Sequence, residues 1–576
     1  MKEKTIKKME DNKYVLYMIL FLVIFHIICN INIKTISFSS DEYIPLSIAA
    51  KFSGLDWMNS RNFNYYYGYI TLLFFIPFFK IPFIYNNSFL LTQAVLSVNS
   101  IFHILSTVII YYSAIMLFEK TDKKIIAVVS LISTCSLQVF NISMGIQIES
   151  LFVLAYAVCF YILLKLVKYN VRLFEIVLLS FFSYVAIANN SRGYVLLISL
   201  CICIALLCIK DKKNSKYLIG YILFSLLFLS IHKFIINPEY SKFFIDNAFN
   251  TSSQPIIDSF KLILSDRTYL KGFFKACLGW IWSCNISTFG LFFITLIMIF
   301  QEYKSFIKEK KIEKIIIPSF ILLNIIGISV LCVTMCIGSI VSSLYEGVGS
   351  RADVVFYVRY FVAILTIADV YALYSLIEKK ILCKKAIKII YGGFVVLSSI
   401  AVIYFIGIPI IGERYGVNNS VFVSLFLKGF DESFRYGYID ISRFYVMCLF
   451  ICIVAGSIVL FAKDKKIVLT ILSVLTFATC LIYTDEIANN KSAYYDNIFD
   501  ENVIDACNKE KKHKIYVSDF APVLQYKVPD AKICYKFENQ DFLIMTEEKS
   551  YLLDQADCQY EYLVTYNQWN LFKKVK

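Results

Sequence analysis

Residues 14–33 read YVLYMILFLVIFHIICNINI, and residues 69–84 read YITLLFFIPFFKIPFI. The first run has the length of about 20 apolar residues that a helix needs to cross a bilayer. The second run is shorter and is interrupted by Pro77, Lys80 and Pro82, so we expect it to lie along the membrane surface. Whether this second run crosses determines the side on which every later segment lies.

Six lysine-rich linkers separate the apolar runs that follow, at residues 119–124, 165–172, 210–216, 304–314, 379–388 and 463–466. All six fall on one side of the membrane only if residues 69–84 do not cross. The N-terminal tail also carries five lysines, and positively charged loops are typical of the cytoplasmic side. We therefore expect the N-terminus in the cytoplasm, followed by a retained signal-anchor helix.

Thirteen apolar segments have the character of membrane spans. They are 14–33, 92–118, 125–142, 151–168, 173–188, 194–209, 217–235, 288–303, 315–338, 358–378, 389–411, 444–462 and 467–484. Because the number is odd, the C-terminus is expected outside the cell. The predicted fold is an all-α polytopic protein of the plasma membrane, with residues 1–484 in the membrane domain, including the external loop 34–91. Residues 485–576 form a small extracytoplasmic α/β or α+β domain.

The composition agrees with this class of protein. The chain is 58% hydrophobic and 17% aromatic, with a mean hydropathy of +0.65. These values lie far above those of a soluble domain. The net charge of +14 comes mostly from lysines in the short linkers, where they set topology and contact lipid headgroups. Nucleic acid is therefore not an expected partner.

The arginines are distributed differently from the lysines. Of nine arginines, only Arg172 falls on the cytoplasmic side, and the others are Arg61, Arg192, Arg267, Arg351, Arg359, Arg414, Arg435 and Arg443. The planar guanidinium group matches the geometry of phosphate oxygens better than an ammonium group does. The external set therefore suits a phosphate-bearing ligand, although ion pairing with loop acids is the alternative for each arginine.

The cysteines and histidines indicate less about the function. Five of the 17 cysteines are expected outside, where they could pair without a readable connectivity: Cys277, Cys284, Cys507, Cys534 and Cys558. Only four histidines occur, which argues against a metal centre built on imidazole. No cofactor is implied with certainty, and assistance by a divalent metal is left open.

Five short motifs resemble those of the GT-C glycosyltransferases, which include protein O-mannosyltransferases and the aminoarabinose transferases of lipid A. The resemblance covers roughly residues 1–410, and every motif falls at the expected external boundary. The motifs are Asp41-Glu42-Tyr43, Tyr65–Tyr69 (YYYGY), Gln147–Ser150 (QIES), Ser191-Arg192-Gly193 and Arg359-Tyr360.

The resemblance implies transfer of a sugar from a polyprenyl-phosphate-linked donor, at the bilayer surface, to an extracytoplasmic acceptor. An acceptor hydroxyl or amine needs a base, and the departing phosphate needs cations. In this interpretation Asp41 is the general base, with Glu42 beside it. The phosphate-binding residues would be Arg192, Arg359 and Tyr360, and further substrate contacts would come from Glu149, Tyr67 and Arg61.

Each of these residues also has an ordinary structural explanation. Asp41 and Glu42 could cap a surface helix that begins at Ile44. Arg359 could extend from a span toward the membrane boundary, and Glu149 could be a solvated loop acid.

Two other classes of protein remain open at this stage. One is a polysaccharide polymerase or ligase, which also combines many spans with external arginines. The other is a transporter or flippase, for which ionisable groups within spans are the usual indication. Asp369, His26 and His103 are the candidates, and they are few for such a pathway.

Overall fold

The computed structural model describes residues 2–36, 38, 40–57, 68–169, 171–241, 254–346, 352–417, 420–534, 537–538, 540–556 and 558–575. For residues 2–12, 40–42, 241, 254–255, 346, 352 and 555 it describes the backbone alone.

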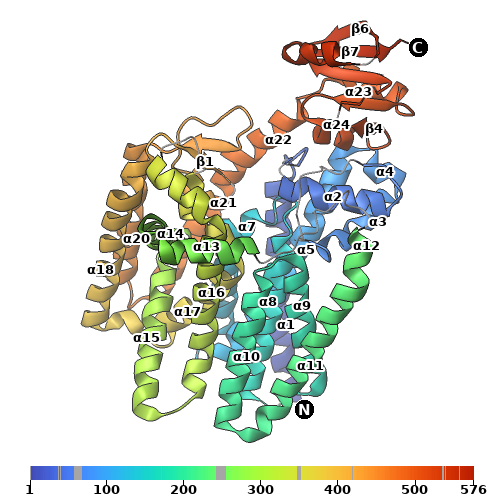
Figure 1. Cartoon of the computed structure of the whole chain (residues 1–576). Helices are drawn as coiled ribbons and strands as arrows, with labels where there is room; N and C mark the ends of the chain where they lie inside the picture. The colour runs from blue at the N-terminus through green and yellow to red at the C-terminus, as the bar shows by residue number, and fades with distance from the viewer. Residues whose placement is uncertain are drawn as a thin grey trace.

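A bundle of long helices forms the body of the protein (Figure 1). Its helices are α1 (Lys2–Asn30), α5 (Ser88–Leu117), α6 (Lys123–Thr134), α8 (Glu149–Lys168), α9 (Leu173–Asn189), α10 (Gly193–Lys210), α11 (Ser215–Ile231), α15 (Leu291–Glu309), α16 (Glu313–Val341), α17 (Val362–Ile377), α18 (Lys385–Val402), α20 (Ile441–Leu460) and α21 (Lys465–Tyr483). The elements that join them are α2 (Ser40–Phe52), α3 (Ile76–Phe79), α4 (Pro82–Tyr85), α7 (Leu137–Asn141), α12 (Asn237–Ser241), α13 (Gln254–Ser265), α14 (Arg267–Ser287), α19 (Val421–Ser424), β1 (Arg414–Gly416), β2 (Tyr436–Tyr438) and α22 (Asn489–Asp496).

The multi-pass membrane architecture is confirmed, but the number of full-length spans is smaller than thirteen. Within the described residues, ten helices are long and apolar enough to cross, or eleven if the bent pair α14–α15 counts as one. The two remaining segments are short. Helix α9 has 17 residues, and α6 has 12 before the chain bends into the five-residue α7. At about 1.5 Å per residue, α6 covers roughly 18 Å, less than the hydrocarbon thickness.

The lysine-rich linkers gather at one end of the bundle, which we call the linker end. Contacts between them are Lys168 Nζ to Glu119 (3.2 Å), the Lys120 backbone N–H to Glu378 (2.7 Å), Lys210 Nζ to Glu313 (3.4 Å) and Lys388 Nζ to the Val459 carbonyl (3.0 Å). The N-terminus lies at this end and the C-terminus lies beyond the opposite one, which we call the loop end (Figure 1). Which end faces the cytoplasm stays a prediction from the lysines.

Residues 69–84 do not form a span. They fold into η1 (Thr71–Phe74), α3 and α4, each of four residues. These pieces lie at the loop end with α2 (Figure 1) and share an apolar core in which Trp57, Tyr69 and Leu72 are fully covered. Helix α2 begins at Ser40, so the expected start at Ile44 is wrong, and Asp41 and Glu42 belong to its first turn.

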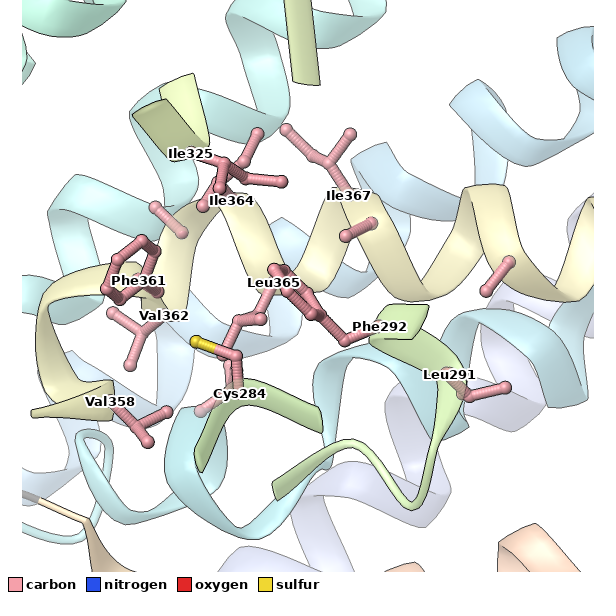
Figure 2. Close-up of a cluster of buried hydrophobic side chains, with 14 of the residues drawn as sticks. Cys284, Leu291, Phe292, Ile325, Val358, Phe361, Val362, Ile364, Leu365 and Ile367 are labelled. Atoms are coloured by element: carbon pink, nitrogen blue, oxygen red, sulfur yellow. The ribbon is translucent and has the colours of Figure 1, made fainter. Parts of the chain in front are cut away.

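A sharp bend separates α14 from α15. The chain bends by 110° between the two helices. Phe289 and Gly290 at the corner both have positive φ angles, of 52° and 91°. A side chain on Gly290 would meet the Tyr391 hydroxyl at 2.3 Å, so the corner requires glycine. The buried side chains of α14 and α15 pack against α17 at this corner, as Cys284, Phe292 and Leu365 show in Figure 2.

The C-terminal part is a mixed sheet covered by helices. Its strands are β3 (Lys514–Val517), β4 (Lys532–Cys534), β5 (Phe542–Thr546), β6 (Tyr560–Tyr566) and β7 (Trp569–Lys574), in the order β4-β3-β5-β7-β6. Strand β3 pairs in parallel with β4 and β5, whereas β7 pairs antiparallel with β5 and β6. Helices α23 (Glu501–Lys509) and α24 (Ala521–Lys527) complete the domain. Trp57 Nε1 donates to the Pro529 carbonyl (3.0 Å), and this hydrogen bond connects the C-terminal domain to the external loop 34–91.

Four of the cysteines expected outside are free thiols, namely Cys277, Cys284, Cys507 and Cys534. Cys507 lies in the core of the C-terminal domain, and its burial raises the pKa of the thiol to about 12. A neutral buried thiol acts as a small apolar side chain, so this cysteine contributes packing.

Candidate active site

The turn between α9 and α10 organises the loop end of the bundle. Its five residues are Asn189, Asn190, Ser191, Arg192 and Gly193. The turn is tight because a side chain at position 193 would meet backbone atoms of Ala186 and Ile187 at 2.5 and 2.3 Å. Glycine therefore lets α10 begin directly against the end of α9 and directs the Arg192 side chain into the protein.

Arg192 is held on every side by protein acceptors. Its Nε donates to Asn190 Oδ1 (2.8 Å), and its Nη1 donates to the carbonyls of Arg359 (3.3 Å) and Tyr360 (2.9 Å). Its Nη2 donates to Glu149 Oε1 (3.1 Å). The side chain is 2% exposed. A guanidinium group engaged at all three nitrogens is locked in position.

Glu149 joins Arg192 to a second arginine. Arg359 Nε donates to Glu149 Oε1 (2.9 Å), and Arg359 Nη2 donates to Oε2 (3.1 Å), which is a two-pronged contact. Glu149 opens α8, whereas Arg359 lies in the 3-10 helix η6 (Val358–Phe361) just ahead of α17. With two guanidinium groups and one carboxylate, these three buried side chains carry one net positive charge.

Aromatic rings complete the Arg192 environment. The guanidinium carbon lies 4.9 Å from the ring centre of Tyr360 and 5.2 Å from that of Phe152. Tyr360 in turn stacks on Tyr357, with ring centres 4.3 Å apart. These rings exclude water from one side of the cluster and favour the cation through their π faces.

The same turn holds the first external segment in place. Asn189 accepts the Gly68 N–H at its carbonyl (3.1 Å), and its Oδ1 accepts the backbone N–H (3.3 Å) and hydroxyl (3.1 Å) of Thr71. A side chain at Gly68, where φ is 78°, would lie 2.6 Å from Ile148 and 3.8 Å from Pro45. Gly68 is therefore close both to Pro45 of α2 and to Ile148, the residue that precedes Glu149.

Several residues proposed from the sequence lie outside what the structure describes. The side chains of Asp41 and Glu42 are outside the described part, as are Arg61, Tyr67 and Arg351 in full. Their roles stay predictions. The structure does describe four of the residues proposed for the site, and they come together in one cluster: Arg192, Arg359, Tyr360 and Glu149.

Two of the ordinary structural explanations are wrong for this cluster. Glu149 is 2% exposed, so it is not a solvated loop acid. Arg359 turns toward Glu149 with 9% of its side chain exposed, so it does not extend to the boundary. Ion pairing, the alternative for each arginine, is present at Arg192 and Arg359, both with Glu149, and at Arg414, which lies 3.5 Å from Asp431. Asn189 and Asn190 were not among the predicted site residues, although an Asn-Asn pair stands directly before Ser191-Arg192 in the sequence.

The three ionisable residues considered for a transport pathway lie on α1, α5 and α17. His26 and His103 are bonded to each other (2.9 Å), and Asp369 is 1% exposed within α17. Among the described residues, no group of three histidine, cysteine or acidic side chains is arranged to hold a metal ion.

The fold is similar to that of ArnT from Cupriavidus metallidurans, solved with undecaprenyl phosphate bound. The TM-score is 0.50 at 9% identity, over 97% of this chain and 98% of that one. The apo form of ArnT gives 0.49 at 10% identity over the same shares. The oligosaccharyltransferase AglB from Archaeoglobus fulgidus, with an inhibitory peptide and dolichol-phosphate, gives 0.42 at 9% identity over 98% of this chain and 74% of that one.

The likeness to ArnT extends over nearly the whole length of both chains and confirms the expected GT-C fold. At 9% identity it concerns the fold alone. No protein-family model matches the sequence, and no curated protein matches it either.

Proposed function

We propose that the protein transfers a sugar from a polyprenyl-phosphate-linked donor to an acceptor on the outer face of the membrane. The acceptor oxygen or nitrogen attacks the anomeric carbon while the bond from that carbon to the phosphate oxygen breaks. The acceptor loses a proton to a carboxylate, and the polyprenyl phosphate departs with a greater negative charge.

The observation that carries this proposal is the buried cluster of Glu149, Arg192 and Arg359 under the first external segment. Arginines around a developing phosphate charge stabilise the transition state without reorganising. Gly68 and Thr71 are hydrogen-bonded to Asn189 in the turn that carries Arg192, and a side chain at Gly68 would lie close to both Ile148 and Pro45 of α2. The arrangement supports a site where a lipid phosphate and an external acceptor meet.

The two arginines have different roles in this proposal. The Arg192 side chain donates to four protein oxygens and lies against two aromatic rings, and it acts as a positioning residue that fixes Glu149 and the Arg359 backbone. Arg359 is the more exposed of the two and contacts the phosphate. When phosphate approaches, Glu149 exchanges its contact with Arg359 for a fuller contact with Arg192, and Tyr360 keeps water away.

Asp41 is the proposed general base and Glu42 its neighbour at the acceptor. Both lie in the first turn of α2, and Pro45 one turn later lies beside Gly68. Arg61 and Tyr67 are proposed to contact the substrate from the segment that joins α2 to Gly68.

The test is replacement of Asp41 by Asn, followed by analysis of cell-surface glycans and of lipid-linked sugars. The proposal predicts that one surface glycan loses a sugar while the polyprenyl-linked form of that sugar accumulates. Asp56→Asn is the matched control, because Asp56 is an exposed acid of the same external segment. If Asp41→Asn and Glu42→Gln both leave the glycans unchanged, the proposed mechanism is wrong.

A further inference from the structure

The first turn of α2 contains a tyrosine that is packed against two other aromatic rings. Tyr43 lies two residues after Asp41 and is 2% exposed. Its ring stacks on that of Trp57, with centres 5.9 Å apart, and the ring of Phe38 lies 6.3 Å away on the chain that leads into α2. Because Asp41 and Tyr43 share one helical turn, the rings that hold Tyr43 also set where the Asp41 backbone lies.

Helix α2 does not fix this turn by its own hydrogen bonds alone. Pro45 lies inside the helix. A proline has no N–H to donate to the carbonyl four residues earlier, and here that carbonyl belongs to Asp41. The position of the first turn therefore depends on tertiary contacts more than the start of an uninterrupted helix does.

Helix α24 of the C-terminal domain supplies such a contact (Figure 1). Tyr526 is 0% exposed and belongs to the same buried core as Tyr43 and Trp57. Its ring centre lies 5.5 Å from that of Phe38 and 6.2 Å from that of Trp57. Its hydroxyl is hydrogen-bonded to Thr92 Oγ1 of α5 at 2.8 Å, which anchors the ring to the bundle. A side chain of the C-terminal domain thus completes the core of the first external segment.

Helix α22 holds the chain just before α2. Ser492 Oγ accepts the backbone N–H groups of Lys34 (2.7 Å) and Thr35 (2.9 Å). Tyr495, one turn further along α22, has its ring centre 5.5 Å from that of Phe38. Ser492 and Tyr495 are both buried, so water does not compete for these contacts. Two helices that follow the last long helix of the bundle therefore contact both α2's core and the chain that leads into α2.

The proposed phosphate site lies on other elements. The arginine cluster is built from α8, η6 and the turn between α9 and α10, whereas the contacts described above join the first external segment to α22 and α24. A base must lie within hydrogen-bond distance of the proton that it removes, and a displacement of about 1 Å can cost about 10²-fold in rate. A shift of α2 should therefore slow transfer without weakening the contacts to the donor phosphate.

We infer that Tyr526 and Ser492 are positioning residues for the first turn of α2, so that the C-terminal domain sets the position of the proposed base. The inference rests on the proposed function and adds to it the part of the chain that holds Asp41 in place. Tyr526 acts through Phe38 and Trp57, and Ser492 acts through the backbone just before α2.

The experiment measures transfer by the full-length protein with Tyr526→Ala or Ser492→Ala, at matched amounts of folded protein in membranes. The donor is the lipid extract and the acceptor is the envelope fraction, both from cells that make the Asp41→Asn protein. We expect kcat to fall about tenfold or more, while the KM for the lipid extract stays within about twofold of the wild-type value. Tyr526→Phe keeps the ring and should restore most of the rate. Wild-type kcat in both alanine variants would overturn the inference.

Tyr551→Ala is the matched control, because Tyr551 is 51% exposed in the same domain and should leave the rate unchanged. A double-variant cycle with Asp41→Asn then separates positioning from a general loss of stability. If Tyr526 acts through Asp41, Tyr526→Ala causes no further loss of the residual rate in the Asp41→Asn protein. An equal fold loss in both backgrounds overturns the inference. If Tyr526→Ala does not fold, Tyr526→Phe and Ser492→Ala take its place in the cycle.

Amide hydrogen exchange in detergent tests the same relationship without any substrate. In Tyr526→Ala and in Ser492→Ala, the amides of residues 43–52 should exchange faster, while those of α8 keep their protection. Unchanged exchange in residues 43–52 overturns the inference even if the rates fall. Failure of the proposed function is a separate outcome, because it would appear as wild-type transfer by both the Asp41→Asn and the Glu42→Gln protein.

Discussion

Glu149 receives both prongs of the Arg359 guanidinium, at 2.9 and 3.1 Å, although the two residues are 210 positions apart in the sequence. The contact joins the start of α8 to the approach to α17, and both side chains are nearly removed from solvent. Because an unpaired buried charge strongly destabilises a protein, the fold depends on the pairing between the Glu149 carboxylate and its two arginines. This dependence makes the cluster open to direct tests.

We predict that Glu149→Gln destabilises the protein by about 3–5 kcal/mol, the range for removing one partner of a buried ion pair. The amide keeps the shape but leaves both guanidinium groups without their counter-charge. Thermal unfolding in detergent measures the effect. Glu119→Gln is the matched control, because Glu119 is 72% exposed in its contact with Lys168 and should change nothing measurable. Equal melting temperatures for the two variants would contradict the ion-pair assignment.

Arg359→Lys should reduce transfer strongly while the protein stays folded. Lysine keeps the charge but loses the two-pronged geometry, and about 2–4 kcal/mol of transition-state stabilisation should be lost. Transfer rates in isolated membranes check this. Arg192→Lys should lower both transfer and melting temperature, because it strips donors from Asn190 and from two carbonyls. Arg414→Lys, at an exposed pair, should be silent. Wild-type rates in both cluster variants would exclude the phosphate role.

Asp41→Asn should lower the transfer rate by roughly 10²–10⁴, the usual contribution of general base catalysis. Melting temperature should hardly change, because asparagine is nearly as good as aspartate at the start of a helix. A cap alone would leave the rate intact, so the two measurements together separate chemistry from capping. Should Asp41→Asn prove active, Glu42→Gln becomes the decisive variant. If that is active too, a polymerase or transporter must replace the transferase.

Gly193→Ala should destabilise the protein by about 1–3 kcal/mol or more, as overpacking does, and displace Arg192. The added carbon would lie 2.3 Å from a backbone nitrogen of α9, which no rotamer change relieves. Gly456→Ala in α20 is the control, since nothing lies within 4 Å of that position. It should stabilise α20 by about 0.5–1 kcal/mol. Melting temperatures of the two purified variants should move in opposite directions, and a shift in the same direction would disprove the close approach.

A tag placed after Lys576 should be cut by protease added to intact cells or spheroplasts. A reporter inserted in residues 304–314 should be active only inside. The reason is that the lysine-rich linkers share one end of the bundle and the C-terminus lies beyond the other (Figure 1). A protected C-terminal tag would reverse the orientation and remove the site from the outer face.

Much of the site could be anticipated from short motifs, but its internal arrangement could not. Arg192, Arg359, Tyr360 and Glu149 were all candidates on residue type and position. Their mutual contacts were not readable, because they join three helix ends far apart in the sequence. The supporting role of Asn189 likewise depends on Thr71, which is 118 positions away.

Three features were readable from the amino-acid sequence: the polytopic bundle, the failure of residues 69–84 to form a span, and the common end of the lysine-rich linkers. Each of these follows from local properties, since hydropathy, proline and charge act on a segment through its contact with lipid and water. Three other features became visible only in the folded chain: α6 is too short for a full span, α14 and α15 form a corner at Gly290, and Glu149 lies between two arginines. These features depend on packing between distant helices, where the burial of one side chain is set by residues that the local sequence does not contain.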